Sequence, residues 1–350
     1  MKKVSILLSG LRFGGAEKVS LNLAQAFQNK GYVVDILVLK KTGELIELAE
    51  KNFNLIDLNC DKTYKLPFKL VRYIFKSSPT ALISTFWKLS LISCVARVVR
   101  PSMYLFCVEH TTPSKASFIP TYLFYITSSI FYQFSSKVIC VSSGVLDDVK
   151  NHTFGLNNKL KVIFNPVYPP NKLTIGDNSS NTKLVWCGRL DEPKNPKLMI
   201  ESFEAINREH GLTLTFIGEG PYLSELKSLT KFRKLDHLVN FEGYIEDAYS
   251  KIGEHDILIL TSDREGLPTV LIEALHCGLY IISTDCSLGI HDIIDHGVNG
   301  LVVPCNNKLL LKEAITNSIN INQKRSFQSG TAKKFLPEFV IKEYLLLMTP

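Results

Sequence analysis

Two acidic side chains lie in the stretch Ser262–Gly278, which reads SDREGLPTVLIEALHCG, and they suit a ligand rich in hydroxyl groups. Glu265 and Glu273 are eight positions apart, a little over two helical turns, so they face similar directions if a helix starts early in this stretch. One carboxylate could hold sugar hydroxyls and the other ribose hydroxyls. The backbone amides of Gly266 and Leu267, at the expected helix start, could bind an anion.

Two cations follow a predicted strand in the second half of the chain. The segment CGRLDEPKN places Arg189 directly after Gly188 and puts Lys194 five residues later. Arginine offers a planar pair of donors and lysine a point charge, so together they could clamp a diphosphate. Two solvated charges are the alternative. A second loop, IGEGP, carries Gly218 and Gly220, which suggests that a ligand approaches the backbone there.

The first half of the chain has two weaker candidates. Gly14 and Gly15 precede a helix expected from Ala16, and small residues there let an anion reach the helix N-terminus. A tight strand-to-helix turn explains them equally well. The segment VEHTTPS follows another strand and places Glu109 and His110 at its end. A lone histidine is more often structural, but this position favours function.

The elements that must position these residues alternate between short apolar runs and helical patterns. The runs are rich in Val, Ile, Leu and Phe without alternation, which is typical of strands buried on both faces of a parallel sheet. The predicted strands are Val4–Leu8, Val33–Leu39, Ala81–Ser84, Tyr104–Cys107, Lys137–Val141, Leu160–Phe164, Lys183–Cys187, Leu212–Ile217, Leu238–Phe241, Ile257–Leu260, Tyr280–Ser283 and Leu301–Val303. We therefore predict an α/β fold with two Rossmann-like, doubly wound parallel-sheet domains, whose ligands bind beyond the carboxyl ends of the strands.

The domain boundary follows from composition. Residues 165–181 read NPVYPPNKLTIGDNSSN, which is dense in residues that break regular structure. We predict a first domain over 1–165, a linker over 166–181 and a second domain over 182–329. Residues 330–350 should form a C-terminal helix, roughly Lys333–Met348, that packs back towards the first domain.

Composition excludes several classes of protein. The 350 residues are 45% apolar and 21% charged, which is ordinary for a globular protein. The eight cysteines show no CxxC pair and no metal spacing, so we expect reduced, buried thiols in a cytosolic protein without a metal site. The N-terminal MKKVSILLSG fits a buried strand better than a signal peptide.

The net charge of +7 suits nucleic acid, anionic lipid or a phosphorylated substrate. No nucleic-acid module is recognisable, so a nucleic-acid partner is not expected. Ala116–Ser136 is uncharged over about one bilayer crossing but contains many polar residues. It reads either as a helix packed in the protein or as one that faces an acceptor or a membrane interface.

Taken together, these motifs resemble glycosyltransferase family 4, the glycosyl transferases group 1, which has the fold called GT-B. The similarity runs over nearly the whole chain. It rests on the order and spacing of GGAE (14–17), EHT (109–111), FNPV (164–167), GRLDEPKN (188–195), GEGP (218–221), EGLPTVLIE (265–273) and NGLVV (299–303).

The resemblance implies a retaining transfer from a nucleotide-sugar donor in a cleft between the two domains, with no metal and no cofactor; consistent with this, the chain has no DxD triplet. It implies that Arg189 and Lys194 neutralise the donor diphosphate, that Glu273 binds the ribose and that Glu265 lies against the sugar. His110 would contact the sugar near the reacting carbon. The resemblance further assigns donor binding to Gly14, Gly15, Gly188, Gly218, Glu219, Gly220, Gly266, Leu267 and Pro268, and the vicinity of the acceptor or sugar to Glu17, Glu109 and Thr111. Two departures, CGLY at 277–280 and LGIHDII at 288–294, leave the donor open.

A weaker similarity points to bacterial enzymes that extend glycans on polyprenyl diphosphate carriers. Lys65, Lys69, Arg72 and Lys76 recur at three- and four-residue steps and give one cationic helix face. The apolar neighbours that we expect beside it are Leu66, Leu70, Ile74 and Phe75. Such a helix can lie on an anionic membrane, although a solvated helix face is the alternative. We therefore expect a peripheral protein on the cytoplasmic face of the inner membrane.

Three functions remain open from the sequence. The first is transfer of a hexose or N-acetylhexosamine from a UDP-sugar, with GDP-mannose as the alternative donor, to a glycan or lipid-linked oligosaccharide of a surface polysaccharide. The second is a nucleotide-sugar epimerase of the same fold, because fold alone does not separate them. The third is a nucleotide-sugar-binding protein without activity, which the intact set of charged residues disfavours.

Overall fold

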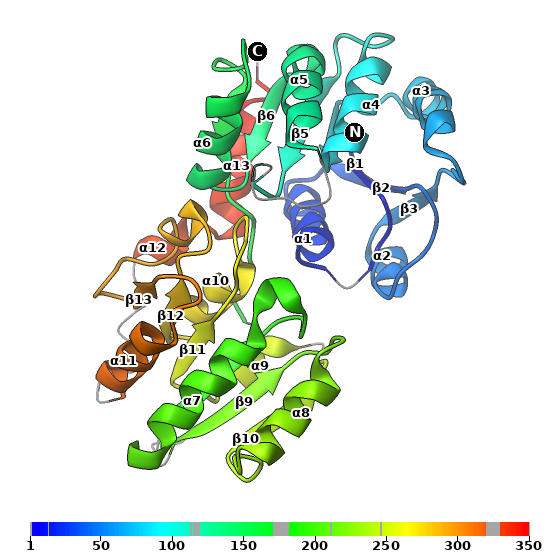
Figure 1. The fold of residues 1–350 in the computed structure, drawn as a ribbon. Coiled ribbons are helices and arrows are strands. Elements are labelled where there is room, and N and C mark those ends of the chain that lie inside the picture. The colour runs from blue at the N-terminus through cyan, green and yellow to red at the C-terminus, as the bar shows by residue number, and fades with distance from the viewer. Residues whose placement is uncertain are drawn as a thin grey trace. The chain divides into compact units, whose positions relative to one another are not determined.

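The computed structural model describes residues 2–12, 14–112, 114, 120–170, 182–210, 212–245, 247–319 and 330–349. It forms two compact units (Figure 1). Unit 1 comprises Met1–Tyr168 together with Phe335–Pro350, and unit 2 comprises Pro169–Lys334. Most of the predicted linker, residues 171–181, lies outside the described residues.

Unit 1 contains a seven-stranded parallel sheet with the order β3-β2-β1-β4-β5-β6-β7. Its strands are β1 (Lys3–Leu8), β2 (Val33–Val38), β3 (Asn54–Asp57), β4 (Ala81–Thr85), β5 (Tyr104–Glu109), β6 (Lys137–Cys140) and β7 (Leu160–Val162). The central strands are almost fully buried, as their continuous apolar runs predict. The edge strand β3 was not predicted from the sequence.

The helices of unit 1 are α1 (Gly15–Asn29), α2 (Ile46–Asn52), α3 (Leu66–Ser77), α4 (Trp87–Arg97), α5 (Thr121–Phe131), α6 (Ser143–His152) and α13 (Pro337–Leu346). In Figure 1, α1 and α2 lie on one side of the sheet and α3, α4 and α5 on the other. One apolar cluster joins α3, α4 and α5 to the sheet. On the opposite side, the ring of Tyr344 in α13 packs against Phe27 and Phe106, with centroids 6.0 and 5.6 Å away.

Unit 2 contains a six-stranded parallel sheet with the order β10-β9-β8-β11-β12-β13. Its strands are β8 (Lys183–Cys187), β9 (Thr213–Ile217), β10 (Val239–Gly243), β11 (Ile257–Leu260), β12 (Tyr280–Thr284) and β13 (Gly300–Val303). Its helices are α7 (Pro196–His210), α8 (Leu223–Phe232), α9 (Ala248–Ile252), α10 (Thr269–His276), α11 (Lys308–Ser318) and α12 (Gly330–Lys333). The predicted fold class, two Rossmann-like parallel-sheet domains, is therefore confirmed.

The C-terminal helix differs from its prediction. The expected single helix over Lys333–Met348 is divided, because Leu336 is extended and Pro337 occupies the first turn of α13. Proline lacks the amide hydrogen that a continuing helix would need. Within the described ranges, no helix is both long and apolar enough to cross a bilayer.

Both sheets change direction at one pair of central strands, β1 with β4 in unit 1 and β8 with β11 in unit 2. Chain connections leave such a pair in opposite directions, so their carboxyl ends open a crevice that loops line. The residues that follow these four strands are therefore the ones to examine for chemistry.

Candidate active site

In unit 2 the loops after β8 and β11 bring Lys194 and Glu265 together. Lys194 Nζ donates to Glu265 Oε1, and Ser262 Oγ donates to the same oxygen over 2.8 Å. Burial alone lowers the pKa of Lys194, but the charge and hydrogen bond of Glu265 raise it above its ordinary value. The lysine is therefore a fixed cation at the switch point.

A hydroxyl beneath this pair holds the two loops in register. Thr261, the first residue after β11, places Oγ1 3.0 and 2.8 Å from the carbonyl oxygens of Lys194 and Asn195. The indole of Trp186 in β8 donates to the same Oγ1 over 2.9 Å. Asn195 adopts a left-handed conformation (φ 46°), which asparagine tolerates better than most residues. The cation is thus positioned by the fold and not by its own flexible chain.

Arg189, the second predicted cation, is fixed by a different carboxylate. Its Nε and Nη2 donate to Asp191 Oδ2 over 2.8 and 2.6 Å, whereas the arginine side chain is 70% exposed. Asp191 itself is buried, and its Oδ1 has no hydrogen-bond partner in the described part of the chain. Asp191 was not predicted as a site residue, although it stands inside the GRLD motif.

The glycines of the two post-strand loops have a structural role that the sequence did not reveal. A Cβ on Gly218 (φ +133°) would collide with the carbonyl oxygen of Gly188, and one on Gly220 would collide with the backbone of Leu190. The loops are also joined by Leu190 N donating to the Glu219 carbonyl over 2.9 Å. Contrary to the prediction, the close approach that requires Gly218 and Gly220 is between the two loops, while Gly188 itself has room for a Cβ.

The stretch that contains both glutamates also differs from the prediction. Helix α10 begins only at Thr269, with Pro268 as its N-cap, so Glu265 and Gly266 precede the helix. Gly266 and Leu267 are therefore not at a helix start, and the helical argument for Glu265 and Glu273 facing alike does not hold. Pro268 and Leu267 are buried.

Glu273 is a buried residue within α10. The nearby Tyr249 of α9 has its pKa raised by burial and, second, by the charge of Glu273. Glu273 therefore faces α9 in this unit, and the structure does not bring it into the Lys194–Glu265 contact.

In unit 1 the N-terminus of α1 is covered by the chain's own carboxylate. Glu17, in the first turn of α1, folds back so that a Cβ on Gly14 would overlap its carboxyl group. Burial raises the pKa of Glu17, and its own amide and Arg12 oppose this. Gly14 is extended (φ −158°), and a Cβ on Gly15 would meet no atom, so only Gly14 is constrained by contact. The predicted anion site at this helix end is the place where Glu17 now lies.

Glu109 ends β5 and is buried beneath the strand end. The hydroxyl of Tyr132 donates to Glu109 Oε1. Burial raises the pKa of Glu109 to about 7, against the lowering effect of the Tyr132 hydrogen bond. Glu109, which the sequence predicted to lie near the acceptor or the sugar, is therefore inside unit 1. Thr111, two residues later, is exposed.

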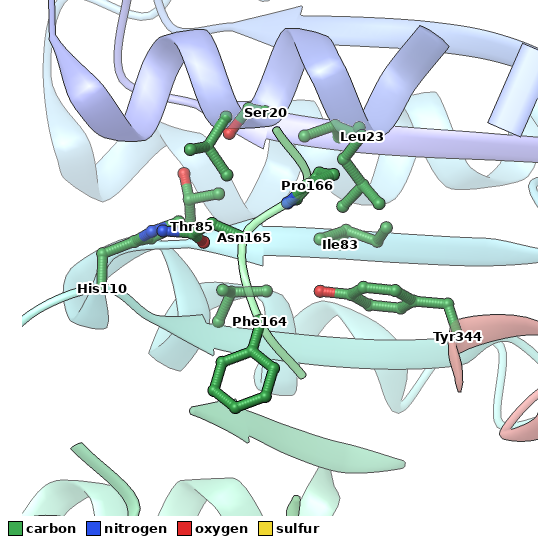
Figure 2. A pocket seen from close by; sticks show the side chains of 12 residues that line it. Ser20, Leu23, Ile83, Thr85, His110, Phe164, Asn165, Pro166 and Tyr344 are labelled. Carbon is green, nitrogen blue, oxygen red and sulfur yellow. The ribbon is translucent and has the colours of Figure 1, made fainter. Parts of the chain in front are cut away.

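His110 lines a small pocket at the switch point between β1 and β4. Figure 2 shows the ring reaching towards Thr85 and Asn165, with Ser20 of α1 above them in this view. Burial lowers the pKa of His110 to about 4, so the imidazole is neutral at pH 7. Among the described residues, its buried Nε2 has no hydrogen-bond partner. A buried ring nitrogen without a partner indicates a place where a ligand supplies one.

A strained residue stands beside this pocket and was missed. Phe86, directly after β4, has φ 67° and ψ 137°, and its ring centroid lies 5.9 Å from that of His110. A bulky residue with positive φ is uncommon, and such strain gathers at functional sites. Nothing in the sequence TFWK signals it.

Within the described ranges, no group of three or more His, Cys, Asp or Glu side chains could hold a metal ion. The free cysteines are buried or partly buried.

Two family models match the chain. The model of Glycosyltransferase Family 4 matches residues 13–169, and that of Glycosyl transferases group 1 matches residues 174–335. The chain is 25% identical, over 97% of its length and 95% of the relative's, to the GalNAc-alpha-(1->4)-GalNAc-alpha-(1->3)-diNAcBac-PP-undecaprenol alpha-1,4-N-acetyl-D-galactosaminyltransferase of Campylobacter jejuni. It is 24% identical, over 98% of its length and 99% of the relative's, to the amylovoran biosynthesis glycosyltransferase AmsD of Erwinia amylovora.

A solved structure supports the fold. Anabaena Alr3699/HepE in complex with UDP and glucose superposes with a TM-score of 0.83, at 17% identity and 99% coverage of both chains. Matches to both family models, in the expected order and over most of the chain, confirm the resemblance found in the motifs. The chain belongs to glycosyltransferase family 4, with the GT-B fold.

Proposed function

We propose that the protein is a retaining glycosyltransferase that moves a hexose or N-acetylhexosamine from a UDP-sugar to a glycan or lipid-linked oligosaccharide. The observation that carries the proposal is the fixed Lys194–Glu265 pair at the switch point of unit 2. A cation and a carboxylate held together suit a ligand that combines a diphosphate with a sugar.

In the proposed reaction, unit 2 binds the donor. Lys194 and Arg189 neutralise the charge that builds on the diphosphate as the bond between the sugar and the phosphate oxygen breaks. Asp191 already occupies the Nε edge of Arg189, so Nη1 and Nη2 are the donors that would meet a phosphate. Glu265 accepts from the sugar, Glu273 accepts from the ribose, and the chain needs no metal because these cations supply the charge.

In unit 1, we assign the acceptor and the reacting sugar to the vicinity of His110 and not to the small pocket that it lines, because that mostly apolar pocket has room for only about one water molecule. A neutral imidazole with an unpartnered Nε2 can exchange a hydrogen bond with a sugar hydroxyl, whereas a cation there would be costly to bury. Glu17, in the first turn of α1, is a candidate carboxylate for an acceptor hydroxyl. The donor diphosphate would reach Gly14 and Gly15 only after the Glu17 carboxylate leaves the N-terminus of α1.

The donor and acceptor classes are supported by the relatives. UDP and glucose are the ligands named for the Anabaena structure, and the Campylobacter enzyme acts on a diphosphate-linked undecaprenol glycan. We propose a UDP-sugar before GDP-mannose on this ground, with the pathway being that of a surface polysaccharide. An acceptor of this kind would place the protein on the cytoplasmic face of the inner membrane.

The test is a turnover assay with a panel of UDP- and GDP-sugars and a polyprenyl-diphosphate-linked glycan, in which free nucleotide and the anomeric configuration of the product are measured. We expect UDP release only with acceptor, and a product with the donor's configuration. Conversion of the donor to its epimer would support an epimerase, and donor binding without turnover would support a binding protein. An inverted product would overturn the retaining assignment.

A further inference from the structure

The positive charge of the chain is concentrated in one segment of unit 1. Residues 62–146 contain ten Lys or Arg and a single acidic residue, Glu109. This gives a formal charge of +9, against +7 for the whole chain, and the one carboxyl group is buried. The rest of the protein is therefore slightly acidic. Such segregation of charge indicates an anionic partner for this part of the surface.

Helix α3 and its N-cap Lys65 display four of these cations on the outer side together with exposed aromatic rings. Lys65, Lys69, Arg72 and Lys76 are exposed, and between them lie Phe68 (78% exposed) and Phe75 (65%). The apolar neighbours expected from the sequence differ: Leu66, Leu70 and Ile74 are fully buried and belong to the core. Helix α3 is thus cationic and aromatic and contains no acidic residue. The exposed Asp61 lies near it, because the Asp61 pKa is lowered first by the Lys40 hydrogen bond and further by the charges of Lys65 and Lys69.

Helix α5 and the turn that follows it expose an apolar stripe. Tyr122, Ile126, Ile130 and Phe134 recur at four-residue steps and are all at least half exposed, whereas Phe124 and Ser128 on the opposite side are buried. This part of the uncharged stretch noted in the sequence is described, and residues 115–119 before it are outside the described residues. A helix of this kind leaves uncovered the apolar surface that a core helix would bury.

The two surfaces belong to one layer. α4 packs against α3 on one side and α5 on the other, on the same side of the sheet (Figure 1). Val95 in α4 and Val98 and Val99 directly after it are further exposed apolar residues of this layer. We call the exposed residues of these three helices the α3–α5 face.

A buried network holds α3 in place. Tyr73, on its inner side, donates to Asp35 Oδ2 over 2.5 Å, and Ser77 donates to the same oxygen over 3.1 Å. Lys3 and Asn54 complete the shell of this carboxylate at 3.1 and 2.8 Å. A helix fixed in this way from inside presents its outer residues in a defined orientation.

We propose that the α3–α5 face docks on an anionic lipid bilayer, with α3 supplying the electrostatic attraction and the α5 stripe entering the headgroup region. The proposal rests on the proposed function only in that a lipid-linked acceptor gives the docking a purpose. Cations with interleaved aromatic and aliphatic side chains are the pattern of an interfacial surface. A nucleic-acid partner would account for the cations but not for the exposed Ile126 and Ile130. A second copy of the chain docked on this face would bring its own cations against these cations, and the two sets would repel each other.

The two helices should respond differently to salt. Each basic residue near an anionic bilayer strengthens binding about five-fold, and salt screens this. Replacing Lys65, Lys69, Arg72 and Lys76 by Gln should weaken binding about 10²–10³-fold at low salt. Ile126→Gln with Ile130→Gln should weaken binding about ten-fold or more at every salt concentration, because insertion of apolar side chains is not screened.

The experiment is co-sedimentation of the full chain with phosphatidylglycerol-containing vesicles and with pure phosphatidylcholine vesicles, from about 0.02 to 0.5 M salt. A matched charge control replaces Lys227, Lys231, Lys234 and Lys308 of unit 2, all exposed, by Gln. A matched apolar control replaces the exposed Phe232 and Leu309 by Gln. Both controls should bind as the wild type does, and binding should need anionic lipid.

Three results would overturn the proposal. Wild-type protein could ignore anionic vesicles at low salt, and retained binding of an RNA oligonucleotide would then assign the face to nucleic acid. The charge control could weaken vesicle binding as much as the α3 variant does. Binding would then depend on the net charge of the protein and not on the α3–α5 face. Sedimentation equilibrium could show a dimer that Ile126→Gln with Ile130→Gln converts to monomers, which would assign the stripe to a second copy.

Failure of the proposed function gives a different result. The α3 and α5 variants should retain wild-type nucleotide release with a water-soluble glycan acceptor, whereas Arg189→Ala should lose release but bind vesicles normally. Vesicle binding by a wild-type protein that turns over no nucleotide-sugar would refute the transferase and leave the docking surface standing.

Discussion

Replacement of Lys194 by alanine should separate what its charge does for folding from what it does for the reaction. The ammonium group contacts Glu265 Oε1, and the two side chains are 27% and 13% exposed. Exposed ion pairs contribute about 0–1 kcal/mol, and loss of one partner from a fully buried pair costs about 3–5 kcal/mol. For a mostly buried pair that retains the Ser262 hydrogen bond, we expect a loss of about 2 kcal/mol, or roughly 4–8 °C in Tm.

The effect on turnover should be larger. One electrostatic contact to a developing charge is typically worth about 10²–10³-fold in rate, which corresponds to about 3–4 kcal/mol in the barrier. Lys194→Ala should therefore remain folded at 25 °C and lose at least 100-fold in kcat for nucleotide release. Thermal unfolding and steady-state kinetics on the same preparation measure both.

A double variant provides the control. Lys194→Met with Glu265→Gln removes both charges and keeps similar side-chain lengths, so the Tm should return towards that of the wild type. Turnover should stay low, because neither the cation nor the carboxylate is restored. If activity returned together with stability, the loss in Lys194→Ala would reflect a weakened loop, and the assignment of Lys194 to the leaving diphosphate would be wrong.

Four further results are expected. Glu109 keeps its proton up to about pH 7 in the folded chain, whereas the unfolded chain loses this proton above about pH 4.5. The contribution of Glu109 to stability should therefore fall as the pH rises from about 4.5 to 7. Glu109→Gln should flatten the dependence of Tm on pH in this window, and an unchanged dependence would contradict the burial argument. His110 should have the opposite effect on the pH dependence of stability, because burial lowers its pKa from 6.5 to about 4. Wild-type stability should fall as the pH decreases from about 6.5 to 4, and His110→Asn should remove this contribution to the fall. Gly218→Ala should destabilise by about 3 kcal/mol while Gly188→Ala stays near the wild type, and equal effects in urea unfolding would refute the loop-packing account. Nucleotide release should survive excess chelator, and a rate restored only by added manganese or magnesium would count against cation-only neutralisation of the diphosphate.

Much of the fold was predictable because buried parallel strands read as continuous apolar runs. The edge strand β3 escaped because Asn54 and Asp57 are exposed, so its sequence NLID resembles a loop. The division at Leu336 was signalled by Pro337, which the helical pattern around it obscured. Periodicity alone placed Phe75 and Ile74 together as apolar neighbours of the cationic face. In the structure Phe75 is exposed, whereas Ile74 packs in the core.

The site was predictable in part for a similar reason. Positions after strands can be read from the chain, and Arg189, Lys194, His110 and Glu265 all stand there. Contacts between distant segments cannot be read in this way, so the pairing of Lys194 with a residue 71 positions later was not predicted. The collision that excludes a side chain at Gly218 depends on the neighbouring loop, and the strain at Phe86 depends on the turn into α4.

The membership of α13 in unit 1 has a consequence for how the chain is made. Tyr344 covers Phe27 and Phe106, yet it is synthesised after the whole of unit 2. At about 5–20 residues per second, roughly 10–35 s pass between the synthesis of Tyr168 and that of Tyr344. During this interval the apolar side of the first sheet lacks its last helix and is available to chaperones or to aggregation. Synthesis of α13, and not completion of the N-terminal sequence, is therefore the event that closes the first core.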